Sequence, residues 1–119
     1  MGYHIQLYTI QTRQAQMAMK EDTFFENPKN FIPFTNEQYE NLIESLKEYN
    51  YYIEKQENDT IYFLNEEYKS IQAILDTSAL YLSSSFTDSF EIGMMASELT
   101  DTNEFAKYDP QNVGWEIIE

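Results

Sequence analysis

The chain contains no cysteine, which excludes disulfide bonds, thiolate metal sites and cysteine nucleophiles. Its 3 glycines, at positions 2, 93 and 114, are too few and too dispersed for a phosphate-binding loop of the Walker or dinucleotide type. His4 is the only histidine, so a multi-histidine zinc or iron site is excluded, although an all-carboxylate magnesium or calcium site stays open. No apolar run reaches the roughly 18 residues that a membrane helix needs. We therefore expect no cofactor, no metal and no membrane contact.

Positive charge is also scarce. There are 7 Lys and Arg residues against 21 Asp and Glu residues, which gives a formal net charge of -14. This charge repels the phosphate backbone of nucleic acids, so we expect no nucleic-acid partner. The chain is nevertheless 42% hydrophobic and 16% aromatic, which is far more than acidic disordered segments carry. Its 119 residues predict one folded domain over 1–119, and the lack of an N-terminal signal pattern predicts a cytoplasmic location.

Local patterns predict the order of helices and strands. Alternating apolar residues over 3–10 predict a strand. Thr35 followed by Gln38 is a capping box, and the apolar residues at helical spacing after it predict a helix over 36–49. The other expected elements are a short helix or irregular arm and a loop within 11–34, a hairpin over 51–64, strands at 70–75 and 79–83, a helix over 87–100, and extended segments at 105–108 and 115–118. This order predicts an α+β fold in which a mostly antiparallel sheet has two main helices packed on one face.

Several apolar residues have expected positions. Three aromatic residues of the 11–34 segment, Phe24, Phe25 and Phe31, are expected to insert into the core. Met94 and Met95 are expected to fill the core from the helix over 87–100, in which Gly93 and Ala96 are small enough for a close approach to the sheet. Met17 and Met19 are candidates for an exposed, adaptable surface.

The distribution of charge suggests a binding face. The outward face of the 36–49 helix carries Glu37, Glu40, Glu44 and Glu48, and residues 61–119 hold eleven acidic residues against two basic ones. Aromatic residues bordered by acidic ones are common at protein interfaces. We therefore expect a non-enzymatic, acidic module that binds a basic protein partner through these four glutamates and Trp115. The plain alternative is that the acidity only keeps the protein soluble.

Two other function classes remain open. The first is a small enzyme or ligand-binding domain with a pocket between the sheet and the 11–34 segment, where His4 would act with Tyr8. No catalytic residue is assigned in that case. The second is a homo-oligomeric structural protein that associates through an exposed strand edge or an aromatic face.

Three short segments resemble a family of small, uncharacterised bacterial cytoplasmic proteins. They are the opening Gly2-Tyr3-His4-Ile5-Gln6-Leu7-Tyr8, the central Phe34-Thr35-Asn36-Glu37-Gln38 that leads to Leu46 and Tyr49-Asn50-Tyr51, and the closing Tyr108-Asp109-Pro110-Gln111 with Gly114-Trp115-Glu116. The resemblance implies a bacterial origin and one α+β domain, and it supplies no activity. The Asp109-Pro110 pair in the closing segment also predicts a turn over 109–112.

Overall fold

The strands form one antiparallel sheet in the computed structural model, which describes residues 2–19, 24–100, 105–109 and 114–115. The order across the sheet is β2-β3-β4-β5-β1-β6-β7, so β1 lies between β5 and β6 in its interior. The strands are β1 (Gly2–Thr9), β2 (Tyr51–Glu57), β3 (Thr60–Asn65), β4 (Gln72–Leu75), β5 (Leu80–Ser85), β6 (Phe105–Asp109) and β7 (Gly114–Trp115).

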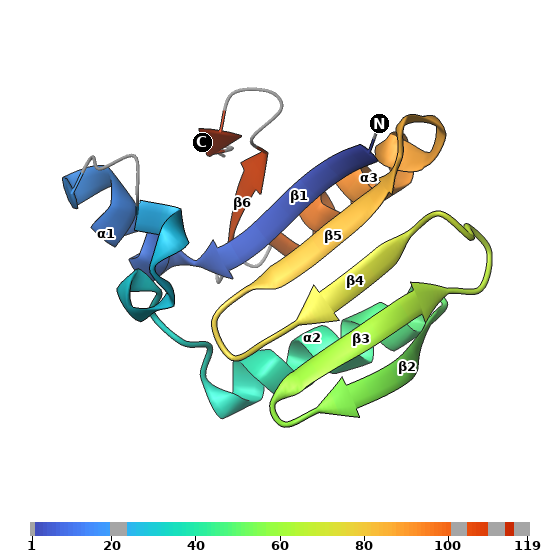
Figure 1. The fold of residues 1–119 in the computed structure, drawn as a ribbon, viewed down its shortest axis with the longest axis horizontal. Helices are drawn as coiled ribbons and strands as arrows, with labels where there is room; N and C mark the ends of the chain where they lie inside the picture. Colours follow the sequence, from blue (N-terminus) through green and yellow to red (C-terminus); the bar gives the residue numbers. More distant parts are fainter. Residues whose placement is uncertain (1, 20–23, 101–104, 110–113, 116–119) are drawn as a thin grey trace.

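Two helices cover one face of this sheet, α2 (Asn36–Glu48) and α3 (Ser89–Thr100) (Figure 1). A third helix, α1 (Ile10–Met19), continues directly from the end of β1 and is followed by the short 3-10 helices η1 (Phe24–Glu26) and η2 (Pro28–Asn30). Another 3-10 turn, η3 (Phe86–Asp88), leads into α3. The predicted α+β fold, a mostly antiparallel sheet with two main helices on one face, is confirmed.

Local chemistry sets both ends of α2. The Gln38 amide donates to Thr35 Oγ1 at 3.1 Å, and the Thr35 amide donates to Gln38 Oε1 at 2.9 Å, so the predicted capping box is present. At the other end Tyr49 is the C-cap residue, and Asn50 follows with a φ of 71°. Asparagine adopts this left-handed conformation at low cost, and the conformation turns the chain from α2 into β2.

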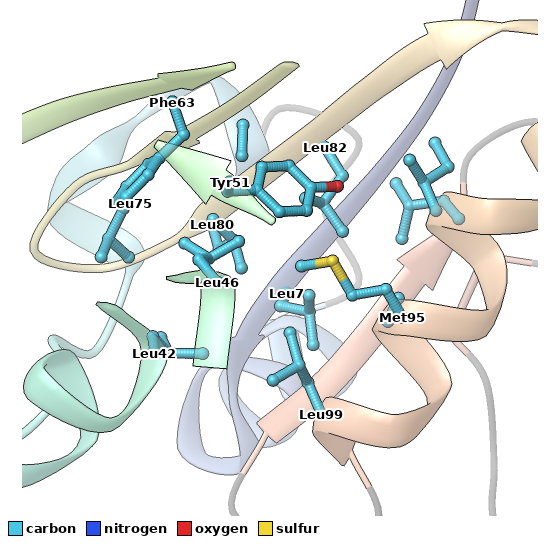
Figure 2. Close-up of a cluster of buried hydrophobic side chains, with 14 of the residues drawn as sticks. Leu7, Leu42, Leu46, Tyr51, Phe63, Leu75, Leu80, Leu82, Met95 and Leu99 are labelled. Carbon is cyan, nitrogen blue, oxygen red and sulfur yellow. The ribbon is translucent and has the colours of Figure 1, made fainter. Parts of the chain in front are cut away.

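The main core lies between the sheet and the two helices. Leu42 and Leu46 of α2 and Met95 and Leu99 of α3 point toward sheet residues that include Leu7 (Figure 2). Alternate residues of β3 and β5 are buried along each strand, as the period of a half-covered strand requires.

A smaller cluster lies on the opposite face, where Phe24 and Phe31 pack with Tyr8 and Ala79. The ring centroids of Tyr8 and Phe31 are 5.2 Å apart. The expectation that Phe24 and Phe31 enter the interior is therefore confirmed, whereas the side chain of Phe25 lies outside the described residues.

Polar contacts also tie this segment to the end of β1. The Thr9 and Thr12 hydroxyls lie 2.9 Å apart, and Thr12 Oγ1 accepts the Ile32 amide hydrogen at 2.8 Å. The segment is thus fixed to the sheet by hydrogen bonds as well as by its aromatic residues.

Two expectations for α3 were wrong. Met95 is buried, but Met94 is 46% exposed because it lies on the side of α3 that turns away from the sheet. Ala96 is fully buried, whereas a Cβ atom added at Gly93 would meet no described atom within 4 Å. Gly93 is therefore not needed for a close approach of α3 to the sheet. The expected turn over 109–112 and the end of the closing segment fall largely outside the described residues.

Candidate functional site

Four glutamates line the outer face of α2. Glu37, Glu40, Glu44 and Glu48 are all exposed, while the core-facing side of the helix is buried. Lys47 is the only basic residue of the helix. A face with four carboxylates and a single ammonium group has a negative potential, which attracts cationic groups.

A groove between α2 and α3 gathers part of this charge. Glu44 and Glu48 line it from α2 and Glu98 lines it from α3, so three carboxylates border one groove of about 380 Å³. Its described lining contains no lysine or arginine and is completed by Asn41, Ser45, Tyr49, Leu99 and Phe105. The groove therefore combines an apolar floor with an acidic rim.

Tyr49 joins the two helices across this groove. Its hydroxyl donates a hydrogen bond to a carboxylate oxygen of Glu98. Its carbonyl oxygen accepts a hydrogen bond from the side-chain amide of the buried Asn65 at 3.1 Å. Because one hydroxyl hydrogen satisfies only part of the acceptor capacity of a carboxylate, Glu98 can still accept hydrogen bonds from a cationic partner.

Neither Tyr49 nor Glu98 was among the predicted site residues. They are 49 positions apart in the chain, and no pattern within one helix shows which residue of another helix will face it. The predicted fold class could have indicated where the groove lies, because two helices on one face of a sheet must have a boundary between them.

The structure separates Trp115 from the α2 face. Trp115 lies in β7, whose backbone pairs with β6 at the edge of the sheet opposite β2. Since α2 packs near β2, the strand of Trp115 lies at the other end of the sheet, and its side chain is outside the described residues. The structure thus groups Glu44 and Glu48 with Glu98 and does not group them with Trp115.

The alternative pair, His4 and Tyr8, lies on one face of β1. Four residues of strand separate the two by about 13 Å. The His4 side chain is exposed, whereas Tyr8 is 2% exposed in the cluster with Phe24 and Phe31. Burial, followed by the nearby Tyr81 and Asp76, raises the pKa of the Tyr8 phenol well above its ordinary value. The described residues therefore do not bring His4 and Tyr8 into one pocket.

The methionines of α1 are exposed as expected, with Met17 at 51% and Met19 at 44%. The free edge of β2 also exposes Tyr52 and Ile53, but the pairing register shifts between Ile53 and Lys55. Such a bulge, next to charged side chains, discourages pairing of one strand edge with another.

Two further observations concern metals and membranes. Within residues 2–19, 24–100, 105–109 and 114–115, no group of three or more His, Asp or Glu side chains is placed to hold a metal ion. No helix in the same ranges is long and apolar enough to cross a membrane.

The fold and the groove define an acidic α+β protein with a two-helix layer on one face of an antiparallel sheet. Comparison of the chain with protein-family models, with curated proteins and with solved structures finds no match. The resemblance to a bacterial family stays a prediction.

Proposed function

We propose that this chain is a non-enzymatic, acidic protein-binding module of the bacterial cytoplasm, and that its two-helix layer binds a basic protein partner. The observation that carries the proposal is the convergence of three glutamates from two helices, Glu44, Glu48 and Glu98, on one groove. Glu37 and Glu40 extend the same acidic surface along α2.

The groove has the composition of a protein interface. The apolar side chains of Leu99 and Phe105 lie at its floor, and the aromatic Tyr49 lies beside the carboxylates. Protein interfaces commonly combine an apolar centre that includes aromatic residues with a polar, hydrated rim. Lysine or arginine side chains of a partner would pair with the rim, and the negative field would accelerate their encounter.

The spacing of the glutamates favours binding over solubility alone. Glu40, Glu44 and Glu48 form two like-charged pairs at i, i+4, and each pair costs about 0.2–0.5 kcal/mol. A chain that needed acidity only for solubility would lose nothing by dispersing these charges. Their concentration on one face is the arrangement that recognises a cationic surface.

The test compares two triple variants of equal net charge. Glu44→Gln, Glu48→Gln and Glu98→Gln together neutralise the groove, while Glu26→Gln, Glu54→Gln and Glu66→Gln neutralise three exposed glutamates elsewhere. The unchanged protein should capture a basic protein from bacterial lysate at about 50 mM NaCl and release it at about 500 mM NaCl.

The groove variant should retain at least about tenfold less of that protein, whereas the control variant should retain the same amount. Equal loss in the two variants would show that only net charge matters. Equal retention in the two variants, or no retained protein at low salt, would contradict the proposal directly.

A further inference from the structure

The side of α3 that faces away from the sheet carries two large apolar side chains. Phe90 is 70% exposed, the largest exposed fraction of any large apolar side chain in the described residues, and Met94 is 46% exposed. Met95 and Leu99 of the same helix point into the core (Figure 2), whereas Phe90 and Met94 belong to neither core cluster. Exposed apolar side chains on adjacent turns of a helix are typical of surfaces that bind another protein.

These two side chains continue into the acidic groove. Phe90, Met94 and Glu98 are four residues apart in turn, so they form one stripe along the helix, which we call the α3 stripe. Glu98 is exposed and lines the groove between α2 and α3 as well. The α3 stripe therefore joins an apolar surface to the three carboxylates of the groove.

A cleft of about 550 Å³ lies beside the α3 stripe, and all three residues of the stripe line it. Lys107 lines the same cleft from β6, with its Nζ atom 3.2 Å from Ser97 Oγ. Because a lysine lies in the cleft, an apolar side chain of a partner fits there better than a cationic one. Cationic side chains of the partner are then directed to the Glu98 end of the stripe.

We propose that the α3 stripe binds a basic amphipathic helix of the protein partner, an inference that rests on the proposed function and specifies how the partner is recognised. Apolar side chains of that helix lie against Phe90 and Met94, and one of them enters the cleft. Lysine or arginine side chains on the adjoining flank of the helix pair with Glu98 and, across the groove, with Glu44 and Glu48.

The geometry favours a helix over an extended segment. Side chains one turn apart on a helix are separated by about 6 Å, so apolar residues at i and i+4 of the partner match the interval between Phe90 and Met94. An extended segment laid on α3 would find no strand edge to pair with, and its backbone groups would lose water without gaining partners. A helix satisfies these groups internally. Methionine, which is flexible, can also adapt to the side chains that it meets.

Charge favours a basic partner over a second copy of this chain. The formal net charge is -14, so two copies that meet at an acidic surface repel each other. A helix without cations would cover the apolar stripe but would remove water from Glu98 without replacing it by a hydrogen-bond donor. A basic amphipathic helix supplies both the apolar contact and the donors.

The experiment measures the binding of three fluorescein-labelled peptides of about 18 residues by fluorescence anisotropy. The first peptide has leucines at helical spacing and lysines elsewhere, so it forms a basic amphipathic helix. The second contains the same residues in an order that gives no apolar face, and the third has the order of the first with glutamates in place of lysines. At about 50 mM NaCl we expect a Kd of about 10 µM or tighter for the first peptide, at least about tenfold weaker binding of the second and no measurable binding of the third.

Two double variants test the position of the site. Phe90→Ser with Met94→Gln should weaken binding of the first peptide at least about tenfold and leave binding of the second unchanged. Tyr52→Ser with Met17→Gln is the matched control, because it replaces an exposed aromatic residue and an exposed methionine elsewhere, and it should leave both unchanged. All four side chains are exposed, so both variants should fold, which circular dichroism checks.

Methionine methyl groups locate the binding surface in the unchanged protein. With isotope-labelled methionine, the first peptide should shift the methyl resonance of Met94 in NMR spectra. Met17 and Met19 are also exposed but lie on α1, so their resonances should stay in place. This measurement decides the question even if a variant fails to fold.

Equal binding of the two basic peptides, unchanged binding in the Phe90→Ser, Met94→Gln variant, or shifts at Met17 and Met19 in place of Met94 would overturn the inference. A dimer of the unchanged chain that the same variant abolishes would also overturn it, because the occupant would then be a second copy.

The proposed function is judged separately. It survives equal binding of the two basic peptides if the triple variant of Glu44, Glu48 and Glu98 loses both of them. It fails together with the inference if neither basic peptide binds more tightly than the glutamate peptide.

Discussion

Neutralising one glutamate of the acidic groove should make the protein more stable. Glu48 is the last residue of α2, where a carboxylate lies against the negative end of the helix dipole. Glu44 lies one turn before it, and Glu98 lines the same groove from α3. Glu48→Gln removes the charge and preserves the size of the side chain, so the change isolates electrostatic cost from packing.

The size of the gain can be worked from these neighbours. Relief of the i, i+4 repulsion with Glu44 contributes about 0.2–0.5 kcal/mol. Relief of the unfavourable interaction with the helix dipole contributes about 0.3–1 kcal/mol at low ionic strength. Repulsion from Glu98 acts in the same direction, so the free energy of unfolding should rise by about 0.5–1.5 kcal/mol.

Urea unfolding at two salt concentrations measures this gain. In about 10 mM NaCl the midpoint should rise by about 0.3–1 M urea with an unchanged slope, and in about 1 M NaCl most of the rise should disappear. Glu54→Gln on β2 is the matched control, because it makes the same change in net charge near Lys55 and outside any helix.

A Glu48→Gln variant that is no more stable than the unchanged protein at low salt would contradict this prediction. An equal gain in Glu54→Gln would contradict it as well, because the gain would then come from net charge and not from the position of Glu48.

Three further predictions concern the fold. Thr35→Ala removes a capping-box partner and should lower the free energy of unfolding by about 1 kcal/mol in urea titrations; no change would mean that the cap does not stabilise α2. Phe24→Ala leaves a cavity in the smaller cluster and should lower the free energy of unfolding by about 3–5 kcal/mol in the same titrations. A decrease below about 1 kcal/mol would show that the cluster contributes little to stability. Burial raises the pKa of Tyr81 to about 12 and moves the pKa values of Tyr8 and Tyr51 upward as well. The contribution of these three phenols to stability should therefore be complete below about pH 10 and be lost as pH rises further, because the unfolded phenols ionise first. Tyrosinate absorbance should then rise together with the loss of near-UV circular dichroism, and a fully ionised set of tyrosines in a folded protein would contradict the burial argument.

The elements that could be predicted from the sequence are those with a local cause. Thr35 and Gln38 are three residues apart, so their capping box could be predicted from the sequence without any tertiary information. The alternation over 3–10 likewise gave β1, but it suggested that only one face would be buried. Tyr8 is buried on the other face because residues from the 11–34 segment pack there, and that contact is not encoded by the strand pattern itself.

The features that could not be predicted depend on how α3 is rotated about its axis. Its sequence is apolar on more than one side, so periodicity alone did not show that Met95 would be buried and Met94 exposed. The same rotation decides that a Cβ atom at Gly93 would meet no described atom and that Glu98 meets Tyr49. The acidic residues of α2 were predictable because that helix has a single apolar stripe.

The acidic groove gives the net charge of -14 a more specific meaning. Acidity that served only solubility would not require Glu44, Glu48 and Glu98 to converge from two helices on one groove. At physiological ionic strength charges are screened over about 8 Å, so these three carboxylates act most strongly on cationic groups that come close to the groove. The field of the whole chain adds to the field of the groove glutamates, because both are negative. Removing one of these glutamates should therefore weaken an encounter with a basic partner without abolishing it.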